Sequence, residues 1–254
     1  MTAASSPRPK DVEADFDLNA LYAAIHKKRE YAALATSIKR VRDAHSSRYD
    51  LNIALSKVHL AVSTCGKEYI GGVEHQDTEE GSIAGSLIAH AVILYASATE
   101  SQNHKGSKDY GRGQMRVAEG WPEKLRKAHD SVLKLRNTAL AHFGYAADHV
   151  DGPWATDTLY IREYANSSRQ SMCKHIRVNY RQNTVEDLLD ILPAAIDSAS
   201  KIIGDRDAKM YANITSLLDT DADFASIFAT TIRVPVDTPD RTILRPASKR
   251  QAEI

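Results

Sequence analysis

An arginine, an asparagine and a histidine lie close together in the segment SVLKLRNTALAHFGY, Ser131–Tyr145. The guanidinium of Arg136 can bind a phosphate through two parallel hydrogen bonds. His142 can transfer protons near neutral pH, because the unperturbed pKa of imidazole is about 6.5. Asn137 can orient a phosphate oxygen or the imidazole. Together these residue types could bind a phosphate and move protons beside it.

Arg136 falls on the apolar side of the helix predicted for this segment. In helical projection it lies between Val132 and Leu140. An unpaired guanidinium buried there costs several kcal/mol, and arginine cannot lose its proton to avoid that cost. Either Glu100, at the end of the preceding apolar helix, forms an ion pair with Arg136, or the stripe is partly open at an interface or cleft that receives a phosphate. His129, one heptad earlier, is predicted to be a partly buried, hydrogen-bonded residue with a supporting role.

The string RNTALAH, residues 136–142, resembles the motif of HEPN-domain proteins: an arginine, a polar residue, and a histidine near the end of a bundle helix. It is most similar to the abortive-infection branch, whose helices carry RN-x4-AH. The resemblance covers residues 123–144, and outside them no residues can be matched. It implies a helical bundle that dimerises with its two motif helices side by side. Many members are metal-independent ribonucleases of prokaryotic toxin–antitoxin and phage-defence systems, whereas others have lost catalysis and serve as binding modules.

Arg136 and His142 are about 120° apart in projection, so one subunit alone makes a poor site from both. Two copies packed about a two-fold axis would bring both pairs to one groove, in line with the resemblance. RNA cleavage there would use the ribose 2′-OH as the nucleophile. His142 would transfer protons, Arg136 would stabilise charge on the phosphate, and no metal or cofactor would be needed.

Three hypotheses stay open at this point. The first is an endoribonuclease of a prokaryotic defence or toxin system, with RNA as substrate and an antitoxin or regulatory protein as a possible partner. The second is a catalytically inactive HEPN-like module that binds nucleotides or proteins. The third is an unrelated helical scaffold whose Arg136 forms a core ion pair with Glu100.

A second group of basic residues is interleaved with aromatics in a predicted β-hairpin. Such a pattern suits single-stranded RNA, and a charged edge strand that avoids aggregation explains it nearly as well. The candidate substrate-binding residues are Tyr160, Arg162, Lys174, Arg177 and Arg181. A loop with Lys105, Lys108, Arg112 and Arg116 is another candidate. Glu74, His75 and Asp77 form an acidic loop cluster, but no second cluster completes a metal site.

The composition narrows the class of protein. The 254 residues include 33 Lys+Arg and 33 Asp+Glu, so the net charge is zero and an anionic partner must bind a local patch. Two cysteines without metal or redox spacing fit a reducing compartment. The N-terminus lacks the apolar region of a secretory signal. The apolar run at residues 83–98 is shorter than the roughly 20 residues of a membrane span. We therefore expect a cytoplasmic protein without membrane segments.

The periodicity predicts a mainly α protein, a bundle of about five or six helices with one inserted β-hairpin at about residues 156–181. A helical domain spans residues 17–220, between a flexible tail at 1–16 and a Pro-containing tail at 221–254. Helices are expected at 17–44, 50–65, 83–102, about 122–143, from 183 or 184 to 203 with a kink at Pro193, and about 208–218. Gly144 and Gly204 are expected to end their helices. His90 is expected in the core.

Overall fold

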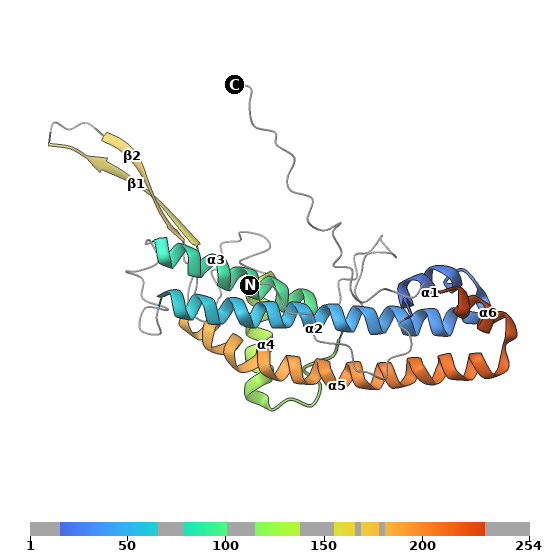
Figure 1. The fold of residues 1–254 in the computed structure, drawn as a ribbon. Helices are drawn as coiled ribbons and strands as arrows, with labels where there is room; N and C mark the ends of the chain where they lie inside the picture. Colours follow the sequence, from blue (N-terminus) through green and yellow to red (C-terminus); the bar gives the residue numbers. More distant parts are fainter. Residues whose placement is uncertain are drawn as a thin grey trace, which may run out of the picture. The chain divides into compact units, whose positions relative to one another are not determined.

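The computed structural model describes residues 16–65, 79–100, 115–137, 155–165, 169–177 and 181–231. Within these ranges the chain is mainly α-helical with one antiparallel β-hairpin, as predicted (Figure 1). A short 3-10 turn, Arg29–Tyr31, precedes the second helix. The elements are α1 Leu18–Ile25, α2 Ala32–Cys65, α3 Glu79–Thr99, α4 Glu123–Leu135, β1 Ala155–Glu163, β2 Arg169–Arg177, α5 Gln182–Thr220 and α6 Ala222–Thr230.

The chain divides into two compact units. One comprises residues 40–208 and the other residues 1–39 with 209–254, so the boundaries fall inside α2 and α5. The candidate site residues Glu100, His129, Arg136 and Asn137 all belong to the first of these units.

The unit of residues 40–208 has an apolar core to which four helices contribute. The buried positions recur at three- and four-residue steps, which is the spacing that places side chains on one face of a helix. Each fully buried aliphatic side chain stabilises the fold by about 1.5–3 kcal/mol. The core includes Leu51, Ala54 and Val58 of α2, Ala91, Val92 and Tyr95 of α3, Ala128, Val132 and Leu135 of α4, and Leu188, Ile191 and Leu192 of α5.

The other unit is held by aromatic contacts and a helix cap. Asp221 is the N-cap of α6 and accepts a hydrogen bond from the backbone N–H of Phe224 at 2.9 Å. The hydroxyl of Tyr31 donates to the same carboxylate at 3.0 Å, and its ring lies 5.4 Å from that of Phe224. The rings of Phe16 and Phe228 are 4.6 Å apart. These contacts join the start of the described chain to its last helix.

The hairpin pairs β1 with β2 in antiparallel register, from Ala155 opposite Arg177 to Glu163 opposite Arg169. Arg169 also forms an ion pair with Glu163 at 3.3 Å. Leu159 and Ile161 are exposed, with 74% and 69% of their surface accessible. The predicted hairpin at 156–181 is therefore confirmed as an element, with strands that end at Arg177.

The prediction of a single helix over residues 17–44 is wrong. The chain leaves the helix after Ile25, and Lys28 adopts an extended conformation before the 3-10 turn. From Ala32 the helix then runs without a break to Cys65, so the helices predicted on either side of the segment HSSRYD are continuous through it, as the sequence allowed. The charged run HKKRE offers few apolar side chains to bury at the break, whereas Leu21 and Ile25 before it are completely buried.

Gly204 does not end a helix, contrary to the prediction. It lies inside α5, which also continues through Pro193 to Thr220. One glycine costs a helix about 1 kcal/mol, which burial of later apolar residues can offset. Met210 and Ile214, beyond the glycine, are both buried. Residues 222–230, placed within the C-terminal tail by sequence, instead form α6.

The apolar helix α3 has one exposed face, so the prediction that His90 lies in the core is wrong. His90, expected in the core, is exposed, and Ile83 and Ile93 are each 46% accessible. The helix has 21 residues and begins at Glu79, before the predicted start at residue 83. Within the described part of the chain it is the one helix long and apolar enough to cross a membrane. Half of its most apolar window is buried inside the protein, as in the core helix of a globular domain.

Candidate functional site

The motif begins where α4 changes its hydrogen bonding. The α-helix ends at Leu135, and residues 136 and 137 form a π-helical turn. The backbone N–H of Arg136 donates to the carbonyls of both Val132 and Leu133. Single π-helical turns inside or at the end of α-helices are frequent at functional sites. The rest of the predicted motif helix, with His142 and Gly144, lies outside the described residues.

Arg136 and Asn137 are half-buried and form a directed hydrogen bond with each other. Nη1 of Arg136 donates to Oδ1 of Asn137 at 2.7 Å. On its other side, Nδ2 of Asn137 points to Oε1 of Glu100 at 3.5 Å, which is long for a hydrogen bond. The asparagine therefore stands between the guanidinium and the carboxylate, and both contacts orient its amide.

The direct ion pair between Arg136 and Glu100, which the sequence left open as an explanation, is not formed. Among the described residues, no carboxylate lies within ion-pair distance of Arg136. Glu100 is half-buried at the end of α3 and reaches Asn137 instead. Arg136 thus keeps its full charge beside a neutral partner, at a position that solvent reaches.

His129 is partly buried and hydrogen-bonded, as predicted. Its Nδ1 lies 2.6 Å from the hydroxyl of Tyr95, and its ring meets the rings of Tyr95 and Trp121 edge to face. Burial lowers the pKa of His129, which the charges of Asp130 and Glu100 partly oppose. Burial also raises the pKa of the Tyr95 phenol. The neutral imidazole is therefore favoured.

His129 and Arg136 do not share one centre. They are seven residues apart on the chain, about 10 Å along a helix axis, and His129 contacts Tyr95 and Trp121 whereas Arg136 contacts Asn137. Glu100 interacts with both parts of α4 and its C-terminal turn, because it contacts Asn137 and its charge raises the pKa of His129. The described part of the site thus offers a guanidinium and an amide, which are groups that can bind a phosphate.

The structure separates the candidate substrate-binding residues along the hairpin. Tyr160 pairs with Met172, Arg162 with Gln170, and Lys174 with Thr158, whereas Arg177 pairs with Ala155. Because neighbouring strand positions alternate between faces, position 177 belongs to the face opposite positions 160, 162 and 174. Arg162 is exposed.

Arg181 stands outside the strands. It is half-buried directly before α5, where its carbonyl accepts a hydrogen bond from the backbone N–H of Val185 at 3.2 Å. It therefore belongs to the start of a helix and not to the hairpin.

Sequence reasoning missed a cleft in the same unit, lined by Arg116, Trp121 and Arg206 among others. Of its residues, only Arg116 was a candidate, as part of a basic loop. The helical pattern of α5 carried no signal for it, because the cleft arises from packing of segments far apart in the chain. In the described ranges, no group of three His, Cys, Asp or Glu residues is placed to hold a metal ion. Glu74, His75, Asp77 and the basic residues 105, 108 and 112 lie outside those ranges.

Comparison with known proteins gives no relative: no protein-family model matches the chain, and no curated protein or solved structure is significantly similar to it.

Proposed function

We propose that this chain is a metal-independent endoribonuclease of the HEPN type, acting in the cytoplasm of a prokaryote as part of a toxin or phage-defence system. The proposal rests on the burial, orientation and charge partners of Arg136. Its guanidinium is half-buried, oriented by Asn137 at 2.7 Å, and forms no ion pair in the part of the chain described. A fixed, uncompensated guanidinium beside a π-helical turn is suited to a phosphate that carries extra charge in the transition state.

The proposed reaction is transesterification within the RNA chain. The ribose 2′-OH attacks the adjacent phosphorus, the bond from phosphorus to the 5′ oxygen breaks, and the products carry a 2′,3′-cyclic phosphate and a 5′-OH. As a neutral imidazole, His142 of one subunit can accept the 2′ proton. As an imidazolium, His142 of the other subunit can supply a proton to the leaving oxygen. Arg136 stabilises the charge that develops on the phosphate oxygens.

Asn137 is a positioning residue in this scheme. Its amide oxygen accepts from Arg136 and its amide nitrogen points to Glu100, so the side chain cannot turn without losing one contact. Glu100 thereby orients the guanidinium through a neutral group and leaves the charge on Arg136 available. A homodimer, and an antitoxin or other regulatory protein that controls the cleavage, complete the proposal.

The hairpin is proposed to bind the RNA nucleotides that flank the cleaved bond. Basic residues at 162, 174 and 177 and a tyrosine at 160 offer contacts to phosphates and bases. Arg162 is exposed on β1.

The chemistry can be tested by the products. The full-length protein should cut a single-stranded RNA with divalent ions chelated, and mass spectrometry should find 2′,3′-cyclic phosphate ends. After the cut position is mapped, an RNA with one 2′-deoxyribose on the 5′ side of that bond should resist cleavage there, because the nucleophile is missing. An RNA with the deoxyribose one nucleotide further away serves as the matched control and should still be cut. Cleavage of the deoxy-substituted bond, or activity that requires a divalent ion, would overturn the proposal.

A further inference from the structure

A cleft of about 570 Å³ lies between α5 and the turn of residues 115–122 that leads into α4. All of the residues around it belong to the unit of residues 40–208. Its size is within the range of about 300–1,000 Å³ typical of pockets for small ligands. None of the motif residues contributes to it, so the cleft is separate from the candidate nuclease site.

The charged residues around the cleft are mostly basic. Arg116 comes from the turn and Lys201 and Arg206 from α5, against a single carboxylate, Glu119. None of the three basic side chains forms an ion pair with a carboxylate in the described part of the chain. Two acidic residues near Arg206 contact other basic side chains: Asp207 pairs with His45 at 3.6 Å, and Asp43 lies 3.9 Å from Arg42.

Arg206 is positioned by the backbone and not by an acid. Its Nη1 donates to the carbonyl of Arg40 at 3.0 Å. Burial and the positive charge of Arg40 lower its pKa, with Asp43 opposing them. A bound anion would relieve this crowding of positive charge, whereas water alone compensates it less well in a partly desolvated site.

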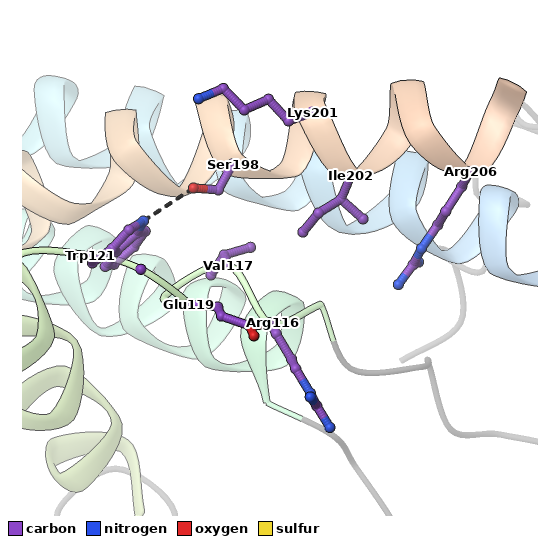
Figure 2. Close-up of a pocket in the computed structure, with 9 residues that line it drawn as sticks. Arg116, Val117, Glu119, Trp121, Ser198, Lys201, Ile202 and Arg206 are labelled. Carbon is purple, nitrogen blue, oxygen red and sulfur yellow. Dashed lines mark hydrogen bonds between the residues drawn. The ribbon is translucent and has the colours of Figure 1, made fainter.

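The opposite end of the cleft is aromatic and apolar. Trp121 is fixed there, because its Nε1 donates to Oγ of Ser198 at 3.1 Å and its ring meets His129 at 5.9 Å. Figure 2 shows Trp121 at one end and Arg206 at the other, with Ile202 extending from α5 between them. Arg116 extends from the turn away from α5, so its side chain would have to turn to share a ligand with Arg206, and Lys201 lies along the outer side of α5.

We propose that this cleft binds a small phosphorylated ligand with a planar ring, of the size of a mononucleotide. The phosphate binds to Arg206 and Arg116, and the ring rests on Trp121 and Ile202. A free phosphate would use only the basic end, so a ring-bearing phosphate should bind more tightly than inorganic phosphate. The proposal does not depend on the nuclease assignment, because it uses none of the motif residues.

Trp121 gives the test a direct signal. The chain has two tryptophans, so Trp154→Phe leaves Trp121 as the one fluorophore of its kind. We expect adenosine 5′-monophosphate to change the emission of this variant saturably. Inorganic phosphate should need at least about tenfold higher concentration, and adenosine should have little effect, because each lacks one half of the contacts. Calorimetry on the unmodified full-length chain should give the same order of affinities, and it replaces the fluorescence if the variant does not fold.

Two arginine variants distinguish a specific binding site from nonspecific electrostatic attraction. Arg116→Ala should weaken binding of the nucleotide about tenfold, the loss expected for one hydrogen-bonded charge contact. Arg116 is exposed, so the fold should survive. Arg126→Ala removes the same charge from an exposed position of α4 that does not line the cleft, and binding should stay unchanged.

The proposal is overturned by any of three results. One is no saturation by the nucleotide up to about 10 mM, the weak limit of a specific small-molecule site. Another is equal weakening by Arg116→Ala and Arg126→Ala, which would mean unspecific attraction. The third is binding of an RNA oligonucleotide without binding of the mononucleotide, which would assign the cleft to a macromolecule.

Discussion

The charge of Arg136 is available because its nearest partner is neutral. Asn137 accepts a hydrogen bond from Nη1 at 2.7 Å and so orients the guanidinium without cancelling its charge. A carboxylate in the same place would form an ion pair and reduce the attraction for a phosphate. Glu100 instead stands one residue further away and contacts the amide at 3.5 Å. Under the proposed function, this order of guanidinium, amide and carboxylate suits Arg136 to a phosphate, whereas a direct ion pair with Glu100 would not.

His129 should make stability depend on pH in a predictable direction. Burial lowers its pKa in the folded protein below the unfolded value of about 6.5. Below that value the unfolded chain binds more protons than the folded one, so the free energy of unfolding falls as the pH falls toward the folded pKa. The contribution is fully present above about pH 6.5. Melting temperatures followed by circular dichroism from roughly pH 5 to 8 should show this slope.

Two histidine variants provide the comparison. His129→Gln should flatten the dependence of the melting temperature on pH, because it removes the titrating group. His90→Gln, at an exposed position of α3, should leave the dependence unchanged. An unchanged slope in His129→Gln would show that the burial of His129 does not govern the acid stability.

Among the secondary-structure elements, α5 can be tested for continuity by substituting Gly204. The glycine lies in the interior of the helix without a positive φ, and a Cβ built there meets nothing within 4 Å. Gly204→Ala should therefore stabilise the protein by about 0.4–1 kcal/mol, mainly by restricting the unfolded chain. Urea unfolding at constant m-value measures the change. If Gly204 ended a helix in the left-handed conformation, as the sequence suggested, the same substitution would destabilise the protein.

The elements show which parts of the fold sequence reasoning can reach. Apolar periodicity predicted the helical class, α4 and the hairpin, because these signals are local. It failed at Gly204, at the break near His26 and at the exposure of His90, because tertiary burial decides those positions. Asp221 was not read as a cap, and α6 was therefore assigned to the tail.

Only part of the candidate site could likewise be predicted from the sequence. Arg136 and Asn137 could be found from spacing and residue type alone. The position of Asn137 between Arg136 and Glu100 could not, because it depends on how the ends of α3 and α4 meet. The cleft lined by Arg116 and Arg206 was missed for the same reason, since its walls come from segments far apart in the chain.

For the whole molecule, the proposed active site requires two subunits, because Arg136 and His142 would be about 120° apart in projection on the helix that the sequence predicts. Arg136→Ala and His142→Ala should each be inactive alone. When the two variants are mixed and allowed to exchange subunits, each mixed dimer regains one Arg136 and one His142, and part of the cleavage should return. Native mass spectrometry would verify that mixed dimers form. Mixed dimers without any recovery would place the site within a single subunit.

The most direct test of the account is a comparison of RNA cleavage, with divalent ions chelated, by the wild type, Arg136→Ala, His142→Ala and Arg126→Ala. We predict that the first two variants lose about 100-fold or more in rate, as for the loss of a group that stabilises the transition state. Their melting temperatures should stay close to that of the wild type, and Arg126→Ala should cleave normally. A wild type that cuts no RNA, or an Arg136→Ala variant that cuts as fast as the wild type, would contradict the account. Unfolding of Arg136→Ala would instead assign the arginine to the structure.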